Sequence, residues 1–195
     1  AKDVKLRSKE NIVTNAAITA KNDAILTAGT DILINSDISA PNINLSAKEN
    51  ITEVYDNAQN IGASIVTNYV EDGVTKQGIL TTNNNGALDL GSKNNKLGIV
   101  NINNTSENTE DIIKLGNSGS KDLEVIIKND AATDKKVAGS VEVYNYDTDL
   151  EQNYNNIYVN QIYAQGDLSI TNEESYDEDT TKHFGIYIGK IPEYH

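Results

Sequence analysis

The 195-residue sequence contains no cysteine, methionine or tryptophan, and only two prolines and one phenylalanine. Without cysteine the chain forms no disulfide, provides no thiolate nucleophile and holds no cysteine-ligated zinc. This absence suits a protein that crosses a bacterial envelope unfolded, because no disulfide forms before export. No run of 18 apolar residues is present, so the sequence predicts no membrane insertion in this segment.

Positive charge is also scarce: 16 lysines and arginines face 29 aspartates and glutamates, for a net charge of −13. Nucleic acid requires a positive surface to neutralise its phosphates, so the composition argues against a nucleic-acid partner. Hydrophobic residues make up only 37% of the chain, which indicates a narrow or repetitive core. The N-terminal stretch AKDVKLRSKE lacks the apolar segment of a signal peptide, and we expect an internal segment of a larger protein.

A repeat of about 20 residues is the clearest pattern in the sequence, and it spans residues 4–54. Its apolar pieces are three to five residues long, alternate with polar residues and are rich in Val, Ile and Thr, which is typical of β-strands. A unit of this size becomes stable only by stacking on its neighbours. The positions that align between copies are Leu6, Leu26 and Leu45, then Ile12, Ile32 and Ile51, then Ile18 and Ile38.

This repeat predicts an all-β fold, a right-handed parallel β-helix (β-solenoid) with an extra-helical hairpin and loops. Each coil would add about 4.8 Å along the axis and would place equivalent leucines and isoleucines over one another. Asn11, Asp31 and Asn50 occupy the same bend in three copies. Asparagine and aspartate tolerate left-handed backbone, so we expect a stacked polar ladder there, with a row of calcium or sugar ligands as the alternative.

The period is hard to follow after Val54. Two alternating strands joined at Asp72 and Gly73 predict a projecting hairpin at about residues 64–80. Less regular coils follow over residues 86–195, where GDLSI from Gly166 has the character of TDILI from Thr30. A separate β-sandwich from about Tyr55 onward is the alternative. The predicted core residues of this half are Leu88, Leu90, Leu97, Ile99, Ile102, Ile112, Leu115, Leu123, Val125 and Ile127.

The stretch AGTDILINSDISAPNINLSAKENI resembles the haemagglutinin-type repeats of filamentous-haemagglutinin-like adhesins and related type V secreted passengers of Gram-negative bacteria. The resemblance covers about Val4 to Val54. It implies a long β-helix that is secreted or displayed on the bacterial surface, a non-enzymatic adhesin or stalk. Its expected partners are a host-cell receptor or glycan and the neighbouring β-helix coils of the parent chain.

The sequence offers few groups for catalysis, and we assign no catalytic residue, metal or cofactor. The only histidines are His183 and His195, and no phosphate loop or dinucleotide motif is present. Glu10 and Glu49 would stand about 9.6 Å apart by strand spacing, within the range of inverting glycosidases. Both sit where solvated turn residues are expected, so the distance by itself does not indicate catalysis. Because β-helices also include polysaccharide lyases and hydrolases, such an enzyme, with active-site residues that the sequence does not identify, is the alternative function, followed by a toxin passenger or phage fibre.

Tyrosines are concentrated in the C-terminal third of the chain, where they alternate with Asn, Asp and Gln. Tyrosine rings stack on sugar faces and form hot spots in protein interfaces. The alternative is that these rings only cover the sheet, since tyrosine is a good strand former. The candidate partner-binding residues are Tyr144, Tyr146, Tyr154, Tyr158 and Tyr163.

Overall fold

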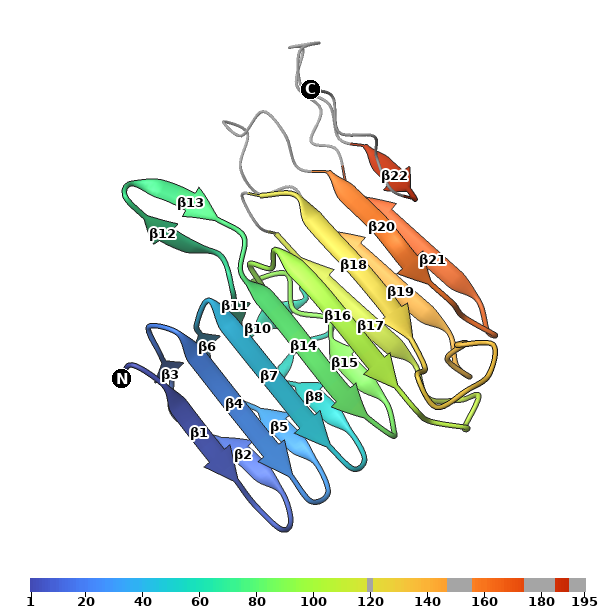
Figure 1. Cartoon of the computed structure of the whole chain (residues 1–195), viewed down its shortest axis with the longest axis horizontal. Helices are drawn as coiled ribbons and strands as arrows, with labels where there is room; N and C mark the ends of the chain where they lie inside the picture. Colours follow the sequence, from blue (N-terminus) through green and yellow to red (C-terminus); the bar gives the residue numbers. More distant parts are fainter. Residues whose placement is uncertain (119–120, 147–155, 174–184, 190–195) are drawn as a thin grey trace.

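The computed structural model describes residues 1–118, 121–146, 156–173 and 185–189, and within these ranges it contains β-strands and no α-helix. Two long parallel sheets form two layers (Figure 1). Sheet A consists of β1 (Val4–Arg7), β4 (Asp23–Ala28), β7 (Asn42–Ala47), β14 (Ile79–Asn84), β16 (Ile99–Asn104), β18 (Leu123–Lys128), β20 (Ile157–Ile162) and β22 (Ile186–Ile188). Sheet B consists of β2 (Ile12–Thr14), β5 (Ile32–Ile34), β8 (Ile51–Glu53), β15 (Leu88–Leu90), β17 (Ile113–Asn117), β19 (Val141–Asn145) and β21 (Leu168–Asn172).

Shorter elements complete the described fold. A small parallel sheet joins β3 (Ile18–Thr19), β6 (Ile38–Ser39) and β11 (Ile65–Val66). Two antiparallel pairs are β9 (Tyr55–Asp56) with β10 (Ile61–Gly62), and β12 (Tyr69–Glu71) with β13 (Val74–Lys76).

The β12–β13 hairpin projects from the two layers (Figure 1). Its turn residues Asp72 and Gly73 have φ of 52° and 75°, the positive values that a tight two-residue hairpin turn requires. The hairpin is shorter than the expected 64–80. Val66 pairs with Ser39 in the small sheet, and β14 already begins at Ile79 in sheet A.

From β1 to β8, neighbouring strands within a sheet lie one repeat apart in the sequence. Leu26 pairs with both Leu6 and Leu45 in sheet A, so the predicted alignment is confirmed. Ile32 pairs in the same way with Ile12 and Ile51 in sheet B. Leu26 and Leu45 are fully buried, whereas Leu6 is 40% exposed because β1 is the edge strand.

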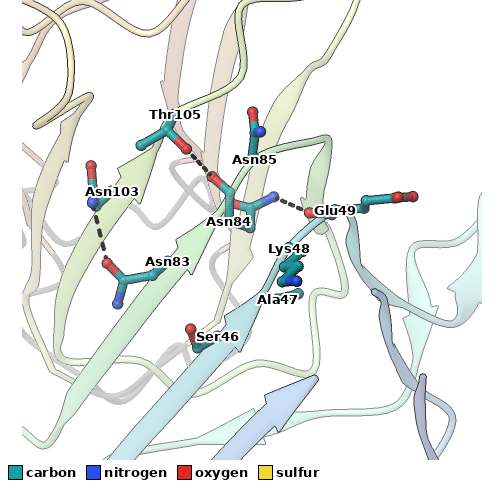
Figure 2. A pocket seen from close by; sticks show the side chains of 9 residues that line it. All are labelled: Ser46, Ala47, Lys48, Glu49, Asn83, Asn84, Asn85, Asn103 and Thr105. Carbon is teal, nitrogen blue, oxygen red and sulfur yellow. Dashed lines mark hydrogen bonds between the residues drawn. The ribbon is translucent and has the colours of Figure 1, made fainter. Parts of the chain in front are cut away.

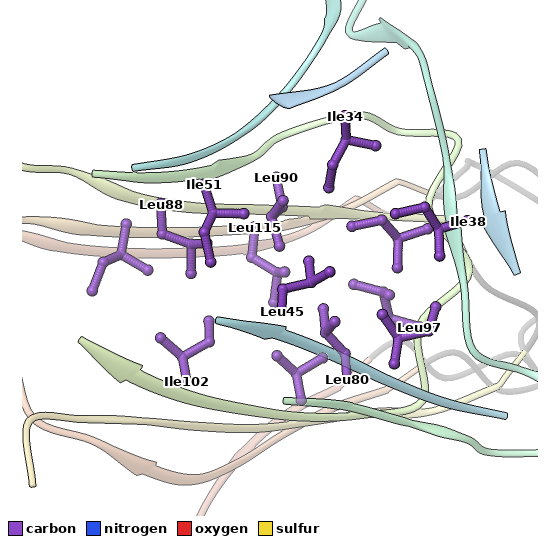
Figure 3. Packing of buried hydrophobic residues seen from close by; sticks show 14 of the residues in the cluster. Ile34, Ile38, Leu45, Ile51, Leu80, Leu88, Leu90, Leu97, Ile102 and Leu115 are labelled. Atoms are coloured by element: carbon purple, nitrogen blue, oxygen red, sulfur yellow. The ribbon is translucent and has the colours of Figure 1, made fainter. Parts of the chain in front are cut away.

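The core is a narrow row of aliphatic side chains between sheets A and B (Figure 3). Eight of the ten predicted core residues of the second half are buried. Ile112 was predicted to be buried but is 51% exposed, because β17 begins at Ile113 and Ile113 faces inward instead. Ile99 is only half-buried, because it takes an outward position of β16 next to the buried Val100.

Both halves of the chain share the same sheets. Strand β14 pairs with β7 in sheet A, and β15 pairs with β8 in sheet B. The alternative of a separate β-sandwich from about Tyr55 onward is therefore wrong. The predicted similarity of the two stretches is confirmed, since Ile32–Ile34 and Leu168–Asn172 both belong to sheet B.

Side-chain amides and carboxylates connect successive repeats at the bends. Asp31 donates its backbone N–H to Asn11 Oδ1 at 3.1 Å, and its own Oδ1 accepts from the backbone N–H of Asn50 at 2.9 Å. The ladder continues when the backbone N–H of Ala87 donates to Asn50 Oδ1. The predicted polar ladder is confirmed, and its side chains satisfy backbone groups where the strands end.

A second ladder lies inside the fold, where each amide is bonded to the next. Asn117 Nδ2 donates to Asn145 Oδ1 at 2.8 Å, and Asn145 Nδ2 donates to Asn172 Oδ1 at 2.9 Å. Asn117 and Asn145 are fully buried. A buried amide is costly unless it is bonded, so the ladder fixes the register of the strands that carry it.

Candidate functional site

Two of the predicted tyrosines form a pair on the outer face of sheet B. Tyr144 lies in β19 and Tyr146 follows its end, and their ring centroids are 4.1 Å apart at 34°. The Tyr144 hydroxyl donates to Glu173 Oε2 at 3.2 Å. Burial raises the pKa of Tyr144, and the Glu173 carboxylate raises it further, so the hydroxyl remains a hydrogen-bond donor at neutral pH.

A second ring pair lies on the outer face of sheet A. Tyr158 in β20 is the register partner of Tyr187 in β22, and their rings stack with centroids 5.1 Å apart at 16°. Burial is also the main cause that raises the pKa of Tyr158. Tyr187 is 41% exposed, which leaves part of this stack accessible.

The predicted tyrosines therefore do not form one surface. Tyr144 and Tyr146 lie on sheet B, Tyr158 lies on sheet A, and the exposed Tyr163 follows the end of β20. Tyr154 lies outside the described residues. The alternation in the sequence indicates which side chains share a face of a strand, but it does not say which sheet each strand joins. Their role in binding stays a prediction.

The sequence pattern did not reveal a further cluster, in which Tyr55 of β9 lies against Asp89 and Lys114 of sheet B. Tyr55 donates its hydroxyl to Asp89 Oδ1 at 2.7 Å, and Lys114 Nζ stands 5.3 Å from the centroid of the Tyr55 ring. Gly91 makes room for this ring, because a Cβ at Gly91 would come within 2.3 Å of the Tyr55 hydroxyl. An ammonium over a ring face is an attractive cation–π arrangement.

Glu53 is the one acidic side chain of the described core. It is 2% exposed and pairs in register with the buried Ile34. Its Oε2 accepts from the Ser92 backbone N–H and from Asn95 Nδ2, both at 3.0 Å, whereas Oε1 has no hydrogen-bond partner among the described residues. Burial raises the pKa of Glu53 to about 8, so the group holds its proton at neutral pH.

An open hollow of about 650 Å³ lies where β7, β14 and β16 end (Figure 2). Asn103 Nδ2 donates to Asn83 Oδ1 at 3.3 Å, and Asn84 Nδ2 donates to the Glu49 backbone oxygen at 3.1 Å. A second hollow of about 240 Å³ shares Asn83 and Asn103 with the first. We refer to the two together as the amide hollow. The residues that line its larger part are Ser46, Ala47, Lys48, Glu49, Asn83, Asn84, Asn85, Asn103 and Thr105.

The remaining candidate residues are exposed or lie outside the part of the chain that the structure describes. No group of three or more His, Asp or Glu side chains there is placed to bind a metal ion. No helix of sufficient length and apolarity to cross a membrane occurs in those residues. Glu10 and Glu49 are both exposed at turns. His183, His195 and most of the acidic stretch at 172–183 lie outside the described residues.

No protein-family model matches the chain, and no curated protein or solved structure is significantly similar to it.

Proposed function

We propose that the chain is a non-enzymatic adhesion or stalk module of a secreted or surface-displayed bacterial protein. In this proposal the chain winds as a right-handed parallel β-helix, and its outer faces attach to a host-cell receptor or glycan. The neighbouring coils of a parent chain are its other partners.

The order of the strands supports the winding. From the N-terminus the chain passes through sheet A, sheet B and the small third sheet twice in succession, as β1 to β3 and then β4 to β6. Every pairing between strands of one of these sheets is parallel, and among β1 to β8 the paired strands are one repeat apart in the sequence. Most later paired strands are further apart in the sequence because longer loops separate them. Strands hydrogen-bonded in this way lie about 4.8 Å apart. Because sheet A has eight strands and sheet B has seven, stacking at this spacing gives a rigid, elongated frame.

The observation that carries the attachment role is the Tyr144–Tyr146 pair. Both rings are half-buried, which holds them in place while part of each face meets solvent. Rigid aromatic rings give a large contact area at a low cost in conformational entropy, and their hydroxyls provide hydrogen bonds. The carboxylate of Glu173 beside Tyr144 adds an acceptor for sugar hydroxyls.

Replacing both rings tests this role. We expect the double variant Tyr144→Ala/Tyr146→Ala to bind host cells or an immobilised glycan panel about 30-fold more weakly than the wild type, because paired aromatic hot spots contribute at least about 2 kcal/mol. Tyr144→Phe/Tyr146→Phe keeps the rings and should retain most of the binding. Unchanged binding by the alanine variant would remove the pair from the proposal.

A turnover assay tests the proposal that the chain is not an enzyme. The wild type is incubated with a panel of acidic polysaccharides, and we expect no product. Reproducible cleavage would favour a polysaccharide-processing enzyme instead.

A further inference from the structure

We infer that the amide hollow on sheet A binds an uncharged, linear polysaccharide that lies across the strands. The hollow contains none of the tyrosines on which the proposed attachment role depends. Binding at the hollow and attachment through the tyrosine pair are therefore separate proposals, and an experiment can contradict one without contradicting the other.

The register of sheet A arranges the outer side chains in and beside the hollow in rows. Thr81 pairs with Asn44 on one side and with Asn101 on the other. Asn83 pairs likewise with Ser46 and Asn103. Successive members of each row are one strand spacing apart, about 4.8 Å. An extended β-linked hexose chain advances by a similar length per sugar, so one sugar ring would meet one strand.

The outer amides differ from the inner ones in what they bond. Asn84 points inward and donates its amide to the backbone oxygens of Glu49, Gly86 and Ala87. In contrast, the half-buried side chains of Asn44, Thr81 and Asn101 make no hydrogen bond to other described residues. The inward amide therefore stabilises the fold. Of the outer side chains, Asn83 and Asn103 bond to each other, and Asn103 Oδ1 also accepts from the Asp130 backbone N–H. Asn44, Thr81 and Asn101 are the outer groups that remain available to a ligand.

The chemistry of these groups matches neutral sugars. An amide and a hydroxyl each donate and accept hydrogen bonds, as sugar hydroxyls do. The rim carries charges of both signs, and Lys128 Nζ is paired with Asp130 Oδ1 at 3.0 Å. Because these charges offset one another, the rim does not favour a charged polymer over a neutral one.

An apolar strip lies beside the polar rows. Ile79 pairs with Ile99 two residues before the Thr81 and Asn101 pair, and therefore on the same face of the sheet. Ile79 is 38% exposed. A hexose has a C–H face as well as hydroxyl edges, and sites for such ligands combine apolar area with a few placed polar groups. A polar row next to an isoleucine strip provides both.

The test is a titration of the full chain with two probes of equal length, neutral cellohexaose and charged hexagalacturonate, by calorimetry. We expect saturable binding of cellohexaose and at least tenfold weaker binding of hexagalacturonate. The variant Thr81→Val/Asn101→Leu keeps the size of both side chains but removes their polar groups, and it should bind cellohexaose at least tenfold more weakly. Circular-dichroism melting of each variant checks that the fold is retained.

Two control variants complete the design. Thr52→Val makes the same type of change on sheet B and should leave cellohexaose binding unchanged. Tyr144→Ala/Tyr146→Ala should also bind cellohexaose like the wild type. The inference is overturned if cellohexaose does not bind, if hexagalacturonate binds equally well or better, or if the folded Thr81→Val/Asn101→Leu variant keeps wild-type affinity.

Discussion

Replacing Glu53 by glutamine should raise the free energy of unfolding by about 3 kcal/mol at pH 7 and leave it nearly unchanged at pH 4. In the unfolded chain this carboxyl ionises near its usual pKa of 4.5, whereas burial raises the folded pKa to about 8. Between these values unfolding releases a proton, so the wild type loses stability as the pH rises, and the loss is complete above about 8. Glutamine does not ionise, and its oxygen still accepts from Ser92 and Asn95.

The size of this effect follows from the distance between pH 7 and the unfolded pKa. Each pH unit between the unfolded pKa of 4.5 and pH 7 lowers the free energy of unfolding of the wild type by about 1.4 kcal/mol, and this interval is about 2.5 units wide. Urea denaturation at pH 4 and pH 7 measures it. Glu49→Gln makes the same change at an exposed turn and should show no such pH dependence. If the difference in the free energy of unfolding between Glu53→Gln and the wild type does not grow between pH 4 and pH 7, the buried, protonated state of Glu53 is contradicted.

Truncating Leu45 should cost about 3 kcal/mol or more of the free energy of unfolding, whereas truncating Leu6 should cost less than about 1.5 kcal/mol. Both leucines belong to one stack, in which Leu26 lies between them. Leu45→Ala opens a cavity between strands that are paired on both sides, while Leu6 is already 40% exposed at the edge strand. Urea denaturation of the two variants at equal pH gives the comparison. Equal losses would show that the two positions are not the inner and outer members of one stack.

The first part of the fold follows from the sequence because its repeats are nearly equal in length. Spacings of 20 and 19 residues place Leu6, Leu26 and Leu45 in register without any knowledge of the loops. Beyond Val54 the spacing is broken by β9 to β13, which lie between β8 and β14. Local alternation still identified most of the core there. It failed at Ile112 and Ile113, because two adjacent isoleucines do not reveal which of them faces inward.

The candidate sites were less accessible to the sequence because they depend on which strands become neighbours. Tyr55, Asp89 and Lys114 come from β9, β15 and β17. The loops between these strands differ in length, so the spacing in the sequence does not predict that the three side chains are neighbours. Glu53 did carry a usable signal. In the aligned repeats it follows Ile51 by two residues, as Ile34 follows Ile32, and that position faces inward.

Disulfide formation between introduced cysteines tests the central claim, which is that β7 and β14, the strands on either side of the irregular region, are register partners in one parallel sheet. The chain has no native cysteine to interfere. Asn44 and Thr81 are register partners on adjacent parallel strands, about 4.8 Å apart, within the range a disulfide spans. Asn44→Cys/Thr81→Cys should therefore oxidise readily in the folded protein. Asn44→Cys/Asn83→Cys, shifted about 6.6 Å along the strand, should not. Equal oxidation of the two pairs, or oxidation of the shifted pair alone, would contradict the stacked register.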